Sequence, residues 1–393
     1  MNIILFGIGK GSEILEKKVR RNHKIVGYSD SVSLIKSYKG IPFYRIDELN
    51  KAECDFIVIT TINRKNAKKI SDMLVEKCPD KSNQIISYHM YSISENYKIK
   101  INYSKQTNET YEGIILGNSH ARDGILPNYL NHKFINLSFS GQDLYYNFQI
   151  LKVCLKDENT LFKNLKYIVW DLWDYNILNY DLSLTDSIIN YWDGGVLDEH
   201  NYFKKSNGSS QTFNDVLYEQ CGIVVDEEKR HLLLDLFDDI YSELHEYDFL
   251  TDNYWSHIPK NPNIPTPYIM GGVTSKRHDN TVEENKMIFM DIMRIINDLN
   301  SNISVIFTLL PRYYQMEYLM SPFVKEWKDE LYQFMDEIIK TYSKETKTLF
   351  CDYKGENELS CNCYYYRDIH HFNTLGGINQ TYKINSILDS LNE

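Results

Sequence analysis

The chain has 393 residues, 42% of them hydrophobic and 25% charged, so it is long enough for two or three globular domains and is neither disordered nor fibrous. Its 54 acidic residues outnumber the 43 basic ones, and the net charge of −11 argues against nucleic acid as a partner. The odd number of cysteines and the lack of a signal-peptide pattern favour a cytoplasmic protein. No apolar run approaches the roughly 18 residues of a membrane span.

The first hundred residues alternate strand-like apolar runs with helical patterns, which is the order of a βαβ fold. In the second helical pattern, Ala67, Ile70, Met73 and Leu74 recur three and four residues apart and form one apolar stripe. We therefore predict a Rossmann-like domain over residues 1–97. Its expected strands are 2–6, 24–28 and 55–60, and its expected helices are 12–21 and 64–77.

A second alternating series begins at Gly113, after a polar segment (98–112) with little periodicity that we interpret as a linker. Its five buried strands, separated by helical patterns, indicate a second doubly wound sheet. We predict a flavodoxin-like, three-layer α/β/α domain over residues 113–393. The expected strands are 113–116, 134–137, 166–171, 304–309 and 348–351.

Two helices of this domain have sequence signals for their first residues. Thr281 and Glu284 form a capping-box pattern before an apolar series at 287–296, and Ser321–Pro322 precedes another that extends to Ile338. Between about 175 and 280 the pattern is interrupted by Asp-, Tyr- and Asn-rich stretches around one amphipathic helix, 227–246. We interpret this region as a helical cap inserted over the strand ends of the second sheet.

A serine lies where open α/β sheets place their ligands. Ser119 follows the strand 113–116 directly, so it is a candidate nucleophile at that strand's carboxyl end. Near the other end of the sequence, Asp368 and His371 are three residues apart, a spacing that lets the carboxylate orient the imidazole that deprotonates the serine. Gly141 follows the second strand of this domain, and its N–H is a candidate oxyanion donor because no Cβ keeps a substrate away.

These segments resemble the SGNH (GDSL-like) hydrolase superfamily, over about residues 113–390. The resemblance implies a five-stranded parallel sheet, with Ser119 as nucleophile, His371 as base, Asp368 as its orienting partner and Gly141 as oxyanion donor. It also implies esterase or acyltransferase chemistry. The matching blocks, in chain order, are Gly117-Asn118-Ser119-His120, residues 136–141 and Asp368–His371.

The third block of the superfamily, Gly-x-Asn-Asp, departs from the pattern here, because the chain reads Asp-Leu-Trp-Asp-Tyr-Asn over 171–176. Asn176 is the candidate oxyanion amide if the turn is longer than usual. Alternatively, Trp173 or Asp174 occupies the position without supplying an amide. A weakened oxyanion hole lowers the rate by about two or three orders of magnitude, so this segment bears directly on activity.

Two alternatives concern the histidine segment. His370 competes with His371 as the base, although its spacing from Asp368 is less suitable. Cys361 and Cys363 could bind zinc together with the two histidines, but the Cys-x-Cys spacing is not typical of zinc sites, and we expect free thiols and no metal.

The N-terminal domain carries a glycine-rich turn. Gly7, Gly9 and Gly11 lie between the first strand and the first helix, and Asp30 ends the second strand, an arrangement typical of nucleotide sites. The third glycine of the dinucleotide pattern is replaced by Ser12. The segment resembles the Rossmann-like domains of bacterial sugar acyltransferases, which implies a nucleotide-sugar ligand; the alternative is that the glycines only permit a tight turn.

We therefore expect a serine-dependent carbohydrate esterase or O-acyltransferase with an acyl-serine intermediate. Its substrate would be an acylated carbohydrate or a sugar-nucleotide precursor of a surface polysaccharide. Hydrolysis needs no cofactor, whereas transfer could use an acyl-CoA donor. Two alternatives remain open: an NAD(P)- or nucleotide-sugar-dependent oxidoreductase that uses the glycine-rich turn, and a non-catalytic carbohydrate-binding protein with a degenerate SGNH pocket.

Overall fold

The computed structural model describes residues 1–33, 35–61, 63–88, 97–156, 160–181, 227–237, 277–299, 303–342 and 346–391. The chain divides into two compact units, and each is described separately. Of the described residues, the first unit contains those up to 88 together with 227–237, and the second contains the remainder.

The first unit is built on a sheet in the order β3-β4-β2-β1-β5-β6, in which β3 alone is antiparallel to its neighbour. The predicted βαβ order is confirmed, and two further parallel strands, β4 and β6, extend the sheet. The elements are β1 (Asn2–Phe6), α1 (Lys10–Lys18), β2 (Lys24–Ser29), β3 (Ser37–Tyr38), β4 (Ile41–Tyr44), β5 (Phe56–Ile59), α2 (Arg64–Lys77) and β6 (Ile85–Ser87).

The helix of the predicted cap, α8 (Glu227–Leu236), belongs to this first unit. The Arg20 guanidinium donates to the Leu234 carbonyl at 3.0 Å, Phe237 forms a bridge with Val19, and its ring packs edge-on against Tyr88. The expectation that this helix covers the second sheet is therefore wrong, because its contacts are with the first unit. The other residues of the predicted cap from 182 to 276 lie outside the described part.

The predicted linker is also wrong over much of its length, because residues 97–106 form the helix α4 (Tyr97–Gln106) of the second unit. Tyr97, Ile101 and Ser104 share one helical face and are 6%, 3% and 2% exposed. The buried Lys100 ammonium donates to the Asn136 carbonyl at 2.6 Å. The polar composition of this segment hid a buried helical face of four residues, one of which is Lys100.

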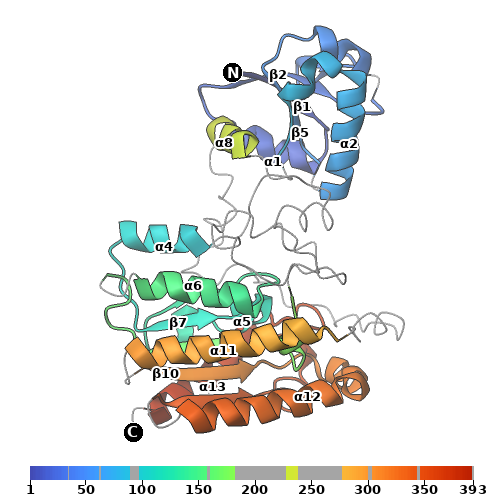
Figure 1. Cartoon of the computed structure of the whole chain (residues 1–393). Helices are drawn as coiled ribbons and strands as arrows, with labels where there is room; N and C mark the ends of the chain where they lie inside the picture. Colours follow the sequence, from blue (N-terminus) through green and yellow to red (C-terminus); the bar gives the residue numbers. More distant parts are fainter. Residues whose placement is uncertain are drawn as a thin grey trace. The chain divides into compact units, whose positions relative to one another are not determined.

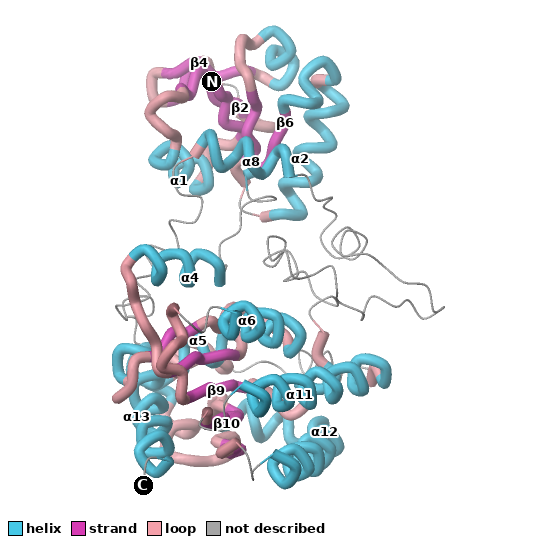
Figure 2. The backbone as a smooth tube through the Cα atoms, turned by 60° about the vertical axis from the view of Figure 1, so that its left-hand side comes forward, coloured by secondary structure: helices cyan, strands magenta, loops and turns pink. Residues whose placement is uncertain are grey.

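The second unit contains a parallel sheet in the order β8-β7-β9-β10-β11, which is the flavodoxin-like order 2-1-3-4-5. Figure 2 shows β9 and β10 between α13 on one side and α11 and α12 on the other. The predicted fold class is confirmed. The elements are β7 (Gly113–Leu116), α5 (Ser119–Gly124), β8 (Phe134–Asn136), α6 (Leu144–Lys156), β9 (Tyr167–Asp171), α11 (Asp279–Leu299), β10 (Ser304–Leu309), α12 (Tyr314–Tyr342), β11 (Thr348–Asp352) and α13 (Thr374–Leu391). Figure 1 labels the helices α5, α6, α11, α12 and α13 and the strands β7 and β10.

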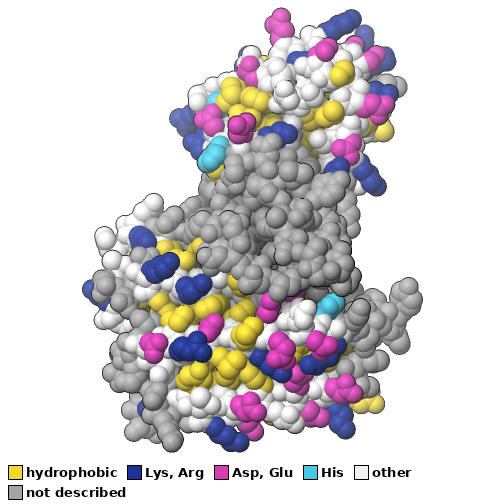
Figure 3. Space-filling model, in the orientation of Figure 1, with side chains coloured by type: hydrophobic (Ala, Val, Ile, Leu, Met, Phe, Trp, Pro, Cys, Tyr) yellow, Lys and Arg dark blue, Asp and Glu magenta, His cyan; other side chains and the backbone are white. Residues whose placement is uncertain are grey.

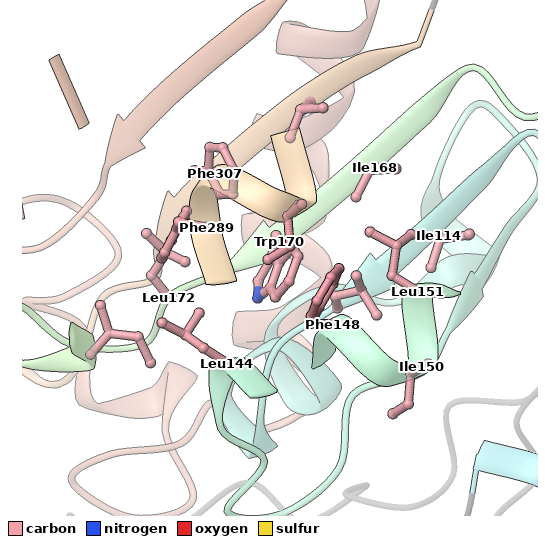
Figure 4. Packing of buried hydrophobic residues seen from close by; sticks show 14 of the residues in the cluster. Ile114, Leu144, Phe148, Ile150, Leu151, Ile168, Trp170, Leu172, Phe289 and Phe307 are labelled. Atoms are coloured by element: carbon pink, nitrogen blue, oxygen red, sulfur yellow. The ribbon is translucent and has the colours of Figure 1, made fainter. Parts of the chain in front are cut away.

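Alternate residues of each central strand enter different cores, as the two-residue period of a strand requires. Trp170 and Phe307 face one side, where Phe289 of α11 stacks on the indole and Leu144 and Phe148 of α6 pack nearby (Figure 4). The other face is covered by α5 and α13, with a core of Ile115, Val169, Ile306, Ile384 and Leu388. With described helices packed on both faces, a ligand is expected at the strand ends of this sheet.

Both predicted helix starts are late. The first hydrogen bond of α11 runs from the Val282 N–H to the His278 carbonyl, so Thr281 lies inside the first turn instead of capping it. Helix α12 begins at Tyr314 and continues through Pro322. A proline cannot donate to the carbonyl four residues earlier, which is that of Tyr318, and the Ser321 hydroxyl donates to this oxygen instead, at 2.9 Å. The hydroxyl thus satisfies the carbonyl that the proline leaves without a backbone donor.

Candidate active site

The turn after β7 has a conformation that requires glycine. Gly117 has φ of +141°, and a Cβ there would lie 2.7 Å from the Cβ of Ala121 and 2.9 Å from the Asp171 carbonyl oxygen. Its N–H donates to the Asn147 side chain at 2.8 Å, and the Asn118 side chain caps α5 by accepting from the His120 N–H. This turn places Ser119 at the first position of α5, at the carboxyl end of β7.

Ser119, His371 and Asp368 form one hydrogen-bonded row. The Ser119 Oγ lies 2.9 Å from His371 Nε2, and His371 Nδ1 lies 2.9 and 3.0 Å from the two carboxylate oxygens of Asp368. An ionised carboxylate only accepts hydrogen bonds, so the imidazole proton belongs on Nδ1. Nε2 is then free to accept the serine proton. The structure thus brings together residues that are 252 positions apart.

The carboxylate of Asp368 is held as an anion by its own turn. Oδ1 also accepts from the backbone N–H groups of His370 and His371, both at 2.8 Å. Burial alone would raise the pKa of Asp368, but the hydrogen bond and charge of the His371 side chain, with these two N–H groups, hold it well below its ordinary value. The residue therefore remains a fixed negative partner for the imidazole.

Two more imidazoles adjoin the row. The His120 ring lies 4.9 Å from that of His371 and 6.5 Å from that of His370. Burial, followed by the charge of His371, lowers the pKa of His120 well below its ordinary value; burial and then Arg312 lower the pKa of His370 to about 4. Both are neutral at pH 7, and in the described structure it is His371 that bonds to the nucleophile.

The depressed pKa of His370 predicts a pH-dependent contribution to stability. Since this pKa lies at about 4 in the folded chain and near 6.5 when unfolded, the unfolded chain binds the proton first as the pH falls. The contribution is complete above pH 6.5 and lost towards pH 4, a change of about 3 kcal/mol. Asp171 acts in the opposite direction, because burial raises its pKa to about 6. We therefore expect the free energy of unfolding of His370→Gln, relative to that of the parent, to rise by about 3 kcal/mol as the pH falls from 7 to 4.

The measurement is the free energy of urea unfolding of both proteins at several pH values, with His278→Gln as the control for loss of an imidazole outside this cluster. Parallel pH curves for the parent and His370→Gln would contradict the prediction.

Gly141 lies in the loop after β8, beside the nucleophile turn. It has φ of +73°, and the Tyr180 hydroxyl donates to its carbonyl at 2.8 Å. The neighbouring Ser140 hydroxyl accepts from Arg122, three residues after Ser119, at 2.8 Å. In the described structure no group accepts from the Gly141 N–H, so it is available as a donor. The Ser119 N–H likewise has no acceptor in the described structure. It is a second candidate donor, which the sequence did not single out.

The loop after β9 departs from what the sequence suggested. Asn176 is the N-cap residue of the short 3-10 helix η4 (Ile177–Asn179), although its side chain makes no capping hydrogen bond, and no hydrogen bond of the described structure joins it to Ser119, His371 or Gly141. Its amide oxygen is buried without a described donor. The role of Asn176 as an oxyanion amide therefore stays a prediction.

Asp174 is committed to a buried ion cluster that the sequence did not reveal. Arg312 donates to both of its carboxylate oxygens at 2.9 and 3.3 Å, and to Glu317 at 2.6 Å. The Lys354 ammonium donates to Glu317 at 2.9 Å and lies 3.8 Å from Asp174. Two cations and two carboxylates thus join the loops after β9, β10 and β11. The one feature of the sequence that could have predicted this cluster is that a charged residue follows each of these strands within a few positions.

The remaining cysteine and metal candidates form no site. Cys361 and Cys363 form no disulfide in the structure. Within the described ranges, no group of three or more His, Cys, Asp and Glu side chains is arranged to hold a metal ion.

In the first unit, the turn after β1 is held by the adjacent strand. The Gly7 N–H donates to the Ser29 carbonyl at 2.7 Å; with φ of +112°, a Cβ at Gly7 would lie 2.6 Å from the Thr60 hydroxyl. Gly9 precedes α1 without a side-chain cap, and Gly11 is buried in its first turn. Asp30 directly follows β2 at the same sheet edge, where one of its oxygens accepts from the Val32 N–H. The structure thus places the candidate ligand residues together.

Ser12, at the third position of the dinucleotide pattern, is fully buried, and its hydroxyl donates to the Gly9 carbonyl at 2.8 Å.

On the face shown in Figure 3, acidic and basic side chains are interspersed over both units. None of the described helices combines the length and the apolar character needed to cross a membrane.

Comparisons with known proteins place few constraints on this chain. No family model matches it, and no curated protein matches it. Among solved structures it is similar to an acetyl xylan esterase, Est2A, from the rumen bacterium Butyrivibrio proteoclasticus, with a TM-score of 0.29 and 7% identity. The match covers 72% of this chain and 64% of the esterase, less than two thirds of its length. At this TM-score the likeness supports no argument about reaction or substrate, so function has to be argued from the site itself.

Proposed function

We propose that this chain is a serine-dependent carbohydrate esterase or O-acyltransferase of the SGNH type. The observation that carries the proposal is the row of hydrogen bonds from Ser119 through His371 to Asp368, at 2.9 and 2.9 Å. This arrangement activates a hydroxyl for attack on an acyl carbonyl.

In the proposed reaction, Ser119 Oγ forms a bond to the acyl carbon while its proton moves to His371 Nε2, and the carbonyl electron pair moves onto oxygen. The N–H groups of Gly141 and Ser119 are the candidate donors to that oxyanion. Collapse breaks the bond to the leaving alcohol, which takes the proton from His371. Water then completes hydrolysis of the acyl-serine, whereas a sugar hydroxyl completes transfer.

The acylated sugar follows from the resemblance of the N-terminal region to the Rossmann-like domains of bacterial sugar acyltransferases. We further propose that the first unit binds the phosphate-bearing part of a sugar nucleotide at Gly7, Gly9, Gly11 and Asp30. If the enzyme is a transferase, an acyl-CoA is the candidate donor.

The proposal is tested with a fluorophosphonate reagent, which phosphonylates activated serines. We expect mass spectrometry to locate the adduct at Ser119 in the parent and in Ser386→Ala, which removes an exposed hydroxyl of α13. We expect no adduct in Ser119→Ala. A parallel incubation with p-nitrophenyl acetate and a free oligosaccharide separates hydrolysis from transfer, since only transfer gives an acetylated sugar. A folded parent that neither reacts nor releases acetate would contradict the proposal and favour a non-catalytic binding protein.

A further inference from the structure

Trp173 combines two features that are unfavourable in the unliganded chain. Its φ is +55°, in the left-handed region that bulky residues rarely occupy. Its indole Nε1 is also buried, and within the described structure no group accepts a hydrogen bond from it. Strained backbone and unmade hydrogen bonds are often found at ligand sites, where the ligand completes what the chain leaves open.

The position of Trp173 in the sheet is the second observation. Strand β7 lies between β8 and β9, so the chain reverses its direction across the sheet at β7. Open α/β sheets bind ligands at this point, outside the carboxyl ends of the strands. The loops that leave β7, β8 and β9 there carry Ser119, Gly141 and Trp173.

The contacts of the indole place it between the other two loops. Its ring lies 6.1 Å from that of His120, the residue after the nucleophile. On another side it packs edge-on against Tyr180 at 5.3 Å, and the Tyr180 hydroxyl donates to the Gly141 carbonyl. The indole thus adjoins both the nucleophile turn and the segment that carries the candidate oxyanion glycine.

We propose that the indole N–H of Trp173 donates a hydrogen bond to the acyl oxygen of the substrate as the tetrahedral oxyanion forms. The inference rests on the proposed function and adds a catalytic residue to it. The N–H transfers no proton; it stabilises the electron pair that the attack of Ser119 moves onto oxygen. Because Nε1 is covered in the unliganded chain, the indole must turn slightly to reach this oxygen, so its environment changes when the adduct forms.

The kinetic test compares Trp173→Phe, which keeps an aromatic ring but lacks the N–H, with Trp327→Phe, which removes the partly buried indole of α12 that packs against the hydrophobic core. We expect Trp173→Phe to lower kcat about 100-fold with KM changed less than about threefold, because the lost bond strengthens in the transition state. Trp327→Phe should change neither. A purely structural role of Trp173 would instead lower the fraction of folded enzyme and leave KM and the kcat per active site unchanged.

A second measurement, NMR of the indole N–H groups in the parent protein, does not require the variant to fold well. In parent protein labelled with ¹⁵N at the tryptophan indoles, we expect one indole N–H resonance, absent from Trp173→Phe, to move downfield when Ser119 is phosphonylated. The resonance absent from Trp327→Phe should stay. If Trp173→Phe is too unstable for assignment, Trp173→Tyr serves the same purpose.

The outcomes separate the two proposals. An active, labelled parent with kcat retained in Trp173→Phe and an unmoved indole resonance overturns the role of Trp173 alone. A parent that is neither labelled nor active overturns the proposed function and, with it, the inferred role of Trp173.

Discussion

Replacing Ser119 or His371 with alanine is expected to lower kcat for ester hydrolysis by about 10⁶-fold, and Asp368→Asn by about 10⁴-fold. The serine and histidine act as one unit, so losing either removes the nucleophilic pathway. Asparagine at 368 keeps the shape of the side chain, but its amide can donate towards His371 Nδ1 and favour the wrong tautomer. The imidazole would then point a proton at Ser119 Oγ instead of accepting one.

The measurement is the steady-state hydrolysis of p-nitrophenyl acetate, corrected for spontaneous hydrolysis at several enzyme concentrations. Ser386→Ala and Asp291→Asn are the matched controls, since each changes an exposed side chain of the same unit. Both should retain parental activity. Ser119→Ala with more than about 1% of parental kcat would show that the reaction uses another nucleophile.

The sequence is informative about this fold where a strand is a continuous apolar run. Strands β7 and β10 were predicted at their observed bounds, because each is buried on both faces and carries no alternation. Strands β4 and β6 were missed because neither is a continuous apolar run: β4 includes Pro42, and the two isoleucines of β6 lie between Gln84 and Ser87. Helix α4 was missed because only one narrow face of it is buried.

For the site, topology allowed a prediction that spacing alone could not give. Parallel strands deliver their carboxyl ends to one edge, so Ser119 and Gly141 could be placed together before the structure was known. The role of Trp173 could not be predicted in this way, because a left-handed φ and an orphaned indole N–H leave no pattern in the sequence. The ion cluster around Arg312 was hidden for a different reason: charged residues are expected at the surface.

Arg312→Met is expected to destabilise the second unit by about 3–5 kcal/mol. The guanidinium is 2% exposed and binds Asp174 and Glu317, whose side chains are 1% and 10% exposed. Burial would raise the pKa of Glu317, but Lys354 and Arg312 lower it to about 2, so this carboxylate is ionised at neutral pH. Without the arginine, two buried carboxylates share one lysine, and the uncompensated charge has no access to water.

Arg277→Met is the matched control. Arg277 also bonds two carboxylates, Glu330 and Asp279, but its side chain is 44% exposed, so its loss should cost only about 0–1 kcal/mol. The free energy is read from the urea dependence of amide hydrogen exchange in peptides from β10, which reports on the second unit alone. Equal costs for the two variants would contradict the prediction.

The double variant Arg312→Met with Asp174→Asn shows whether unpaired charge is the cause. It leaves Glu317 and Lys354 as a neutral pair, so it should be less destabilised than the sum of the two single variants, by about 1–3 kcal/mol. Loss of packing alone would give additive costs.

The single substitution Arg312→Met also affects the active site, because Arg312 is, after burial, the main cause of the low pKa of His370. Arg312→Met should therefore raise that pKa from about 4, so that the acid-dependent loss of stability becomes smaller and ends at a higher pH, which an effect confined to packing would not do.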